Sequence, residues 1–241
     1  MNNRNLNPMT LGLIALMAFF ALKGGMVSNP LDYIMGKALI LPGIIIGLSF
    51  HEFAHGWTAY KLGDSTPKIQ GRVTINPLAH IDIVGFIALL FVGFGWGKAV
   101  QINPFNFKNR RRDEMLVSLA GVTMNLILAV LFTLLYKVLF VSLGWTMAMG
   151  AMPGTIMTIV FYAVYMNIVL MLFNLLPIPP LDGFNVITEI FDLKNTSWWY
   201  KIYDKGFIIL MVLILFNFTG RILYPMVMFM LNLLSNITPF F

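Results

Sequence analysis

Long apolar blocks separated by short polar connections dominate the chain. Four of these blocks are long enough to cross the roughly 30 Å hydrocarbon core of a bilayer as helices. They are residues 9–27, 37–62, 114–141 and 155–176. The pattern therefore predicts a protein that crosses the membrane several times and retains its first span.

Two further apolar blocks depart from this pattern. Residues 206–237 are interrupted by Gly220, Arg221 and Pro225, so they predict either one long broken helix or two shorter spans. Residues 83–97 are rich in glycine and too short for a full crossing. This second block favours a re-entrant or interfacial segment.

The polar connections contain two stretches with β-favouring side chains, residues 68–75 and 100–102. We expect a short hairpin or edge strand there. Together with the apolar blocks, these stretches predict an all-α polytopic membrane protein with about five or six transmembrane helices. No repeat or change of composition divides the chain, so we expect a single domain over residues 1–241.

Composition agrees with a membrane protein. Of the 241 residues, 59% are hydrophobic and 11% are charged, whereas a soluble domain has about a quarter charged. The chain has no cysteine, which excludes disulfides and thiolate metal ligands. The net charge is +6, but the basic residues gather near the span ends. They therefore indicate orientation in a lipid bilayer and no nucleic-acid partner.

The basic residues also predict which side of the membrane each connection occupies. Three groups of basic residues fall on one side of the membrane if the four long apolar blocks cross it and residues 83–97 do not, and the positive-inside rule places that side in the cytoplasm. We expect a multi-pass protein of the cell membrane. The groups are Lys61, Lys68 and Arg72, then Arg110, Arg111 and Arg112, and then Lys194, Lys201 and Lys205.

Residues 51–55 read His51-Glu52-Phe53-Ala54-His55 inside the second apolar block. Two histidines four residues apart on a helix point the same way, so both can reach one zinc ion. Glu52 can face the same metal without binding it, which suits a base that acts on water there. Ionisable residues inside a span are costly and indicate function. Chance polar residues buried in a helix bundle are the alternative interpretation.

A catalytic zinc site commonly takes three protein ligands, so the histidine pair needs a third. Asp182 is the best candidate among the ten acidic residues, because it follows the fourth span in a proline-rich stretch. His55 lies six residues before Lys61, about 9 Å of helix from the cytoplasmic end, so the three groups can meet at similar depth. A turn-capping role for Asp182 and ligation by His80, the third histidine, are the alternatives.

The chain resembles the site-2 proteases, a family of intramembrane zinc metalloproteases, in four stretches that occur in the family's order. It is similar to the compact type without PDZ or CBS domains, with the catalytic core in about residues 37–183. The stretches are residues 51–55, residues 72–82, Gly95-Trp96-Gly97-Lys98, and residues 174–183, which read Asn-Leu-Leu-Pro-Ile-Pro-Pro-Leu-Asp-Gly.

The resemblance implies one Zn²⁺ ion held by His51, His55 and Asp182, with Glu52 as the catalytic acid and base. It also implies that the side-chain amide of Asn174 hydrogen-bonds the scissile carbonyl or the developing oxyanion. A hydrogen bond from the same amide to a neighbouring helix is the alternative. Gly121 to Asn125 is similar to the family's glycine-to-asparagine motif, for which close helix packing is the plainer explanation.

The implied reaction is hydrolysis of peptide bonds in or near the transmembrane segments of membrane-protein substrates. We expect the strand and re-entrant elements to lie near this site, where an unwound substrate could pair with an exposed edge. Two alternatives from other classes remain. One is a membrane metal transporter that uses the same His and Asp residues, and the other is a homologue that binds transmembrane helices without cutting them. The intact Glu52 argues against both alternatives.

Overall fold

The computed structural model describes residues 29–92 and 95–240, and these residues form helices joined by short connections. The predicted first span, residues 9–27, lies outside the described residues. The helices are α2 (Pro30–Lys61), α3 (Thr66–Ile69), η1 (Pro77–Ala79), α4 (Ile83–Val92), η2 (Pro104–Asn106), α5 (Arg110–Leu143), α6 (Ala151–Asn174), α7 (Asp182–Ile190), η3 (Leu193–Asn195), α8 (Ser197–Asp204), α9 (Gly206–Leu215) and α10 (Phe218–Ser235).

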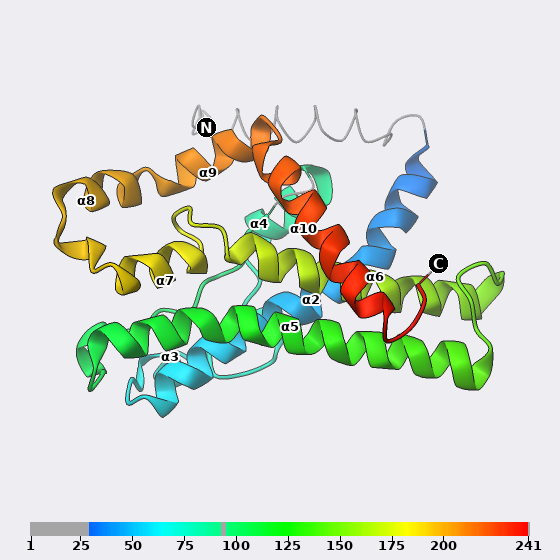
Figure 1. Cartoon of the computed structure of the whole chain (residues 1–241), viewed down its shortest axis with the longest axis horizontal. Coiled ribbons are helices and arrows are strands. Elements are labelled where there is room, and N and C mark those ends of the chain that lie inside the picture. The colour runs from blue at the N-terminus through cyan, green and yellow to red at the C-terminus, as the bar shows by residue number, and fades with distance from the viewer. Residues whose placement is uncertain (1–28, 93–94, 241) are drawn as a thin grey trace, which may run out of the picture.

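Three long helices, α2, α5 and α6, pack against one another and form the centre of the molecule (Figure 1). Glycine on α2 permits the close approach, because a Cβ at Gly43 would lie 2.7 Å from the Cα of Ala163 on α6. All three helices are long and apolar enough to cross a membrane, as is α10. The predicted spans 37–62, 114–141 and 155–176 are therefore confirmed as helices that could cross a membrane.

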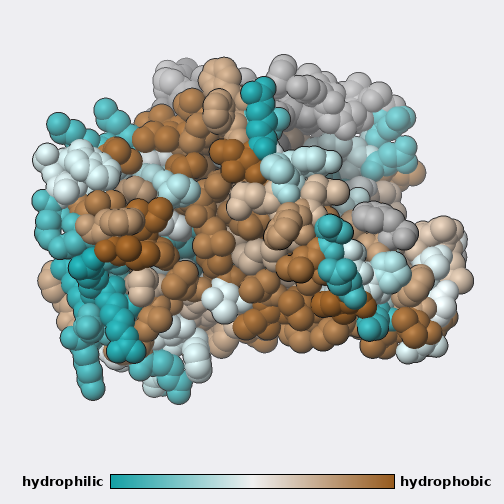
Figure 2. Space-filling model, viewed as in Figure 1, coloured by the Kyte–Doolittle hydropathy of each residue, from teal (hydrophilic) through white to brown (hydrophobic). Residues whose placement is uncertain are grey.

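The outer face of α5 fits a lipid environment. Leu131, Leu134 and Val138 are all exposed, although their side chains are large and apolar. Figure 2 shows a broad apolar surface across the middle of the molecule, with hydrophilic side chains gathered at the end that carries α3 and the start of α5. A broad apolar outer surface is typical of an integral membrane protein.

The fifth apolar block, residues 206–237, folds as α9 and α10, which together form one broken helical path across the bundle (Figure 1). The path begins where Gly206 contacts Pro179, and it ends beyond α10, where the hydroxyl of Tyr136 donates to the carbonyl of Phe240. The break falls at Asn217, which has a left-handed backbone with φ of 55°. Asparagine adopts this conformation more readily than most residues. The block is therefore two helices with a break between them, and of these α10 is long and apolar enough to cross a membrane.

The predicted hairpin over residues 68–75 is wrong. Within the described residues there is no strand, and Thr66–Ile69 forms the short helix α3. Pro67 suits the first turn of a helix, and Gly71 ends the turn with φ of 68°. Residues 100–102 are not a strand either. The strand-like pairing that the described residues retain is one isolated antiparallel bridge between Ile81 and Gly97.

The predicted re-entrant segment is a short helix. α4 covers ten residues of the block 83–97, about 15 Å of helix, which is half of what a bilayer requires. The Asp82 carboxylate accepts a hydrogen bond from the N–H of Gly85 in its first turn. The bridge between Ile81 and Gly97 brings the two ends of this segment together.

Asp64 ties the end of α2 to the connection that precedes α5. Its buried carboxylate accepts hydrogen bonds from the N–H and hydroxyl of Thr66, from the N–H of Asn103 and from the side-chain amide of Asn106. Burial by itself would raise the pKa of Asp64, but these hydrogen bonds outweigh it and hold the pKa below its ordinary value.

We expect this carboxylate to make stability depend on pH. A depressed carboxyl pKa stabilises the fold above the unfolded value of about 3.9, and this contribution is lost as the pH falls through the folded value. Asp64→Asn should therefore melt at a lower temperature than wild type at pH 7 and lose less on acidification to pH 3. Melting temperatures in detergent measure this, with the exposed Asp204→Asn as control. Equal acid sensitivity of wild type and Asp64→Asn would contradict the assignment.

Candidate metal centre

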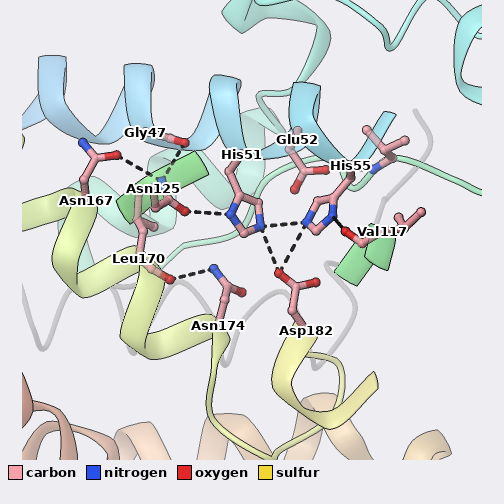
Figure 3. Close-up of polar contacts among 11 residues, drawn as sticks. Gly47, His51, Glu52, His55, Val117, Asn125, Asn167, Leu170, Asn174 and Asp182 are labelled. Carbon is pink, nitrogen blue, oxygen red and sulfur yellow. Dashed lines mark hydrogen bonds and ion pairs between the residues drawn. The ribbon is translucent and has the colours of Figure 1, made fainter. Parts of the chain in front are cut away.

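The side chains of His51 and His55 project from α2 toward the first residue of α7, Asp182 (Figure 3). The two Nε2 atoms lie 2.9 Å apart, and they lie 3.2 Å and 3.3 Å from Oδ2 of Asp182. All three side chains are largely buried, and that of Asp182 is 14% exposed. The structure thus brings together the three residues that the sequence predicts as metal ligands.

Both histidines are held by groups on α5, on the side of the ring away from Asp182 (Figure 3). Nδ1 of His55 lies 2.7 Å from the carbonyl oxygen of Val117, and Nδ1 of His51 lies 2.7 Å from Oδ1 of Asn125. A carbonyl oxygen can only accept, so neutral His55 carries its proton on Nδ1. Its Nε2 lone pair therefore faces Asp182, the orientation that metal-binding histidines commonly show.

These donor atoms fit a zinc ion. Oδ2 of Asp182 is buried and has no hydrogen-bond partner, which is costly unless a cation occupies the space beside it. Two imidazole nitrogens and a carboxylate oxygen are common zinc ligands. Ligand atoms 2.0–2.1 Å from a tetrahedral ion lie about 3.3 Å apart, close to the separations from Asp182. Among the described residues, these three form the group of His and acidic side chains that could hold a metal.

Gly121 on α5 lies directly against the two histidine rings. A Cβ at this position would lie 2.4 Å from Nε2 of His55 and 2.6 Å from Cε1 of His51. These distances are far below ordinary contact. The absence of a side chain at Gly121 therefore lets α5 approach closely enough for Val117 and Asn125 to reach the rings.

Asp182 reaches the histidines because the backbone after α6 turns back tightly at a proline-rich connection. A Cβ at Gly183 would lie 2.1 Å from the carbonyl oxygen of Leu175, so glycine permits the connection to pack on the start of α7.

The far end of α7 is held to the start of α5 and to α8. Arg111 donates to the carbonyls of Glu189 and Ile190, and the indole of Trp199 donates to the hydroxyl of Thr188.

An ion-pair cluster strengthens the attachment of α7 to α5. Lys194, just after α7, contacts both Glu114 on α5 and Glu189 on α7. Burial alone would lower the pKa of the Lys194 ammonium, but its hydrogen bonds to the two carboxylates outweigh burial and raise it. The lysine therefore stays charged and links the helix that carries Asp182 to the helix that carries Gly121.

Glu52 and Asn174, the other two predicted site residues, lie beside the metal group (Figure 3). Glu52 is 9% exposed, and its carboxylate accepts a hydrogen bond of 2.9 Å from the N–H of Val100. The side-chain amide of Asn174 donates to the carbonyl of Leu170, one turn earlier on α6, at 3.0 Å. Both side chains are thus oriented by backbone groups.

His80 does not join the metal group. Its side chain is fully buried, and Nε2 lies 2.7 Å from the carbonyl oxygen of Thr74, in the connection between α3 and η1. It is not among the residues that could share a metal ion within the described part of the chain. The geometry favours Asp182 over His80 as the third ligand.

Sequence reasoning missed several groups that orient the histidines. The carbonyl of Val117 carries no signal in a sequence, because every residue has one. Asn125 stood in a recognised motif but without an assigned partner, and its contact with His51 depends on how α5 is rotated. Asn167 was not singled out, although a polar residue inside the apolar block 155–176 was a signal.

A polytopic membrane fold with a buried His-His-Asp group beside a glutamate defines a membrane protein of metallopeptidase type. Comparison with known proteins agrees, because residues 145–216 match the model of Peptidase family M50. The chain is 39% identical over 186 residues to YwhC of Bacillus subtilis, covering 76% of this chain and 83% of that protein. This protein therefore belongs to peptidase family M50, and the predicted membership of the site-2 protease family is confirmed.

Two further relatives extend the comparison. Rip2 of Mycobacterium tuberculosis is 31% identical over 187 residues, covering 74% of this chain and 68% of Rip2. Rip2 of Mycolicibacterium smegmatis is 29% identical over 207 residues, covering 83% of this chain and 75% of that protein. YwhC and both Rip2 proteins carry zinc metalloprotease in their names. No solved structure matches the chain.

Proposed function

We propose that this protein is an intramembrane zinc metalloprotease that hydrolyses peptide bonds in or near the transmembrane segments of membrane-protein substrates. The observation that carries the proposal is the meeting of the metal-binding atoms of His51, His55 and Asp182 beside the carboxylate of Glu52. Membership of a peptidase family and the names of the relatives support it.

In this proposal, His51, His55 and Asp182 would hold one zinc ion. When bound, zinc supplies Lewis acidity that activates water and polarises a carbonyl group. Glu52 accepts a proton from the attacking water and passes it to the leaving nitrogen. The N–H of Val100 on one oxygen of Glu52 keeps the carboxylate in place, while its other oxygen remains for the proton.

Asn174 acts on the substrate carbonyl in the same scheme. One N–H of its amide is taken by the carbonyl of Leu170, which fixes the plane of the amide. The second N–H is left for an oxygen that gains negative charge during attack. A donor oriented in advance toward such an oxygen contributes about 2.7–4 kcal/mol in well-studied hydrolases.

The substrate must unwind, because a helix hides its peptide bonds in internal hydrogen bonds. We propose that the unwound segment pairs with the backbone of residues 100–102, which lies beside Glu52 because the N–H of Val100 donates to its carboxylate. The site would face the cytoplasmic half of the bilayer, because His55 lies six residues before Lys61 at the basic end of α2. The whole chain would then act as one membrane protease domain.

Zinc removal tests the proposal. Protein purified in detergent should cleave a single-span membrane substrate, lose cleavage when a chelator removes the metal, and recover it when one equivalent of Zn²⁺ per chain is restored. Metal analysis and gel-resolved fragments measure both quantities. A transporter would instead move zinc into proteoliposomes and leave the substrate whole, and a non-proteolytic homologue would bind the substrate without producing fragments. Cleavage that persists without metal would refute the proposal.

A further inference from the structure

Two fully buried asparagines connect the metal centre to α6 (Figure 3). Asn125 on α5 and Asn167 on α6 both have 0% exposure. The amide nitrogen of Asn125 donates to the carbonyl of Gly47 at 3.1 Å and to Oδ1 of Asn167 at 3.0 Å. A buried amide left without partners is costly, so these contacts fix both side chains strongly.

The hydrogen bonds have only one consistent direction. On α6, the carbonyl of Ala163 can only accept, so the Asn167 side chain turns its Nδ2 to that carbonyl, at 2.8 Å. Its Oδ1 then faces Asn125 and can likewise only accept. The carbonyl of Gly47 is a second acceptor on the same side. Asn125 must therefore turn both N–H groups to these two oxygens.

The orientation of Asn125 determines which nitrogen of His51 carries the proton. With its amide nitrogen committed, Asn125 presents Oδ1 to Nδ1 of His51, at 2.7 Å. An oxygen without hydrogens requires a donor opposite it, so in neutral His51 the proton is on Nδ1. Nε2 then offers its lone pair toward Asp182 and His55. If the amide of Asn125 turned over, its N–H would face Nδ1 and move the proton to Nε2, the atom that must bind the metal.

Gly47 contributes to the same arrangement. A Cβ there would lie 2.9 Å from Oδ1 of Asn167 and 2.7 Å from Cδ1 of Leu170. The glycine thus lets α2 approach α6 so closely that the carbonyl of Gly47 and Oδ1 of Asn167 can both accept hydrogen bonds from Asn125. The chain of contacts joins the three helices of the core at one point.

We infer that Asn167 is a positioning residue of the metal centre. It fixes the amide of Asn125 and, through Asn125, orients the neutral imidazole of His51 so that its Nε2 lone pair faces the metal centre. Asn167 lies two helical turns before Asn174 and outside the four stretches that carry the family resemblance. The inference rests on the proposed zinc site, and it assigns to α6 a role in metal affinity in addition to carrying Asn174.

The test measures zinc affinity by competition with a chelator on the intact protein in detergent, without use of the cleavage reaction. Asn167→Leu removes the acceptor and lets the amide of Asn125 turn, so zinc should bind about 10–100-fold more weakly. Asn167→Asp should bind zinc within about threefold of wild type, because a buried neutral carboxyl group reproduces both hydrogen bonds. Asn167→Ala should behave as Asn167→Leu and serves if the leucine variant does not fold.

Thr133→Val is the matched control. Thr133 is fully buried on α5, and its hydroxyl bonds only to the carbonyl of Ala129 on the same helix. This variant should lower the melting temperature but leave zinc affinity unchanged. If Asn167→Leu and Asn167→Ala lower only the melting temperature, Asn167 is structural and the inference is overturned. If wild type itself binds no zinc, the proposed function fails instead.

Discussion

Replacement of Glu52 by Gln should reduce the rate of substrate cleavage by about 10²–10⁴-fold, the range that a positioned acid–base group typically contributes. Glutamine has the shape of glutamate, and its carbonyl oxygen can still accept the hydrogen bond from Val100. It cannot take a proton from water. The fold and the zinc content should therefore remain at the wild-type level while turnover falls.

The measurement is initial cleavage rate together with zinc content for the same preparation. Asp182→Asn is the opposite control, because it weakens a metal ligand and should lose both zinc and cleavage. Unchanged cleavage in Glu52→Gln would exclude the proposed base. Zinc transport that survives in Glu52→Gln, without cleavage by wild type, would favour the transporter alternative.

The positions of the long helices could be predicted from the sequence because membrane crossing is a local property. An apolar run of sufficient length forms a helix in lipid, where each backbone group must be satisfied within the segment. All three helices begin earlier in the chain than hydropathy predicts, as in α5, which begins at Arg110 rather than at residue 114. Charged residues at a span end can continue a helix into the interface, so hydropathy underestimates its length.

The short connections could not be predicted from the same signals. The alternation in residues 68–75 suggested a strand, but β-propensity reflects packing against neighbouring strands, and within the described residues there are none. A proline in the first turn instead starts α3. Likewise, Pro225 lies inside α10 and the break falls at Asn217, because membrane helices tolerate proline when neighbouring groups satisfy the backbone.

Some residues of the candidate site could likewise be predicted from the sequence, and others could not. His51 and His55 could be predicted from spacing alone, since four residues make one helical turn. Asp182 required an argument about membrane depth, and it stands about 130 residues away in the chain. The groups behind the histidines, Val117 and Asn125, depend on the rotation and separation of α5 relative to α2. No local pattern encodes those two quantities.

Gly121 sets that separation, and its replacement is the second large effect that we expect. Gly121→Ala should lower zinc affinity by about 100-fold, the upper end of what loss of the groups behind a metal ligand costs, and should lower the cleavage rate to a similar extent. The added methyl group would overlap both histidine rings, at 2.4 Å from Nε2 of His55 and 2.6 Å from Cε1 of His51. Zinc competition and cleavage assays on the same protein measure the change.

Neither rotation of the histidine rings nor movement of α5 can accommodate the added methyl group without loss of contacts. The rings cannot turn away freely, because α5 itself holds both of them through Val117 and Asn125. A shift of α5 outward would break those same hydrogen bonds and separate the helices that form the core. Overpacking of this kind typically costs about 1–3 kcal/mol in stability, so the variant should still fold while the metal centre is lost.

Gly36→Ala is the matched control, because Gly36 lies within α2 and a Cβ there meets nothing within 4 Å. Alanine at an open helical position should raise stability slightly and leave zinc binding intact. Wild-type zinc affinity in Gly121→Ala would mean that α5 does not hold the histidines as the structure has them. Loss of zinc in Gly121→Ala but not in Gly36→Ala would show that the close contact between α5 and α2 is part of the metal centre.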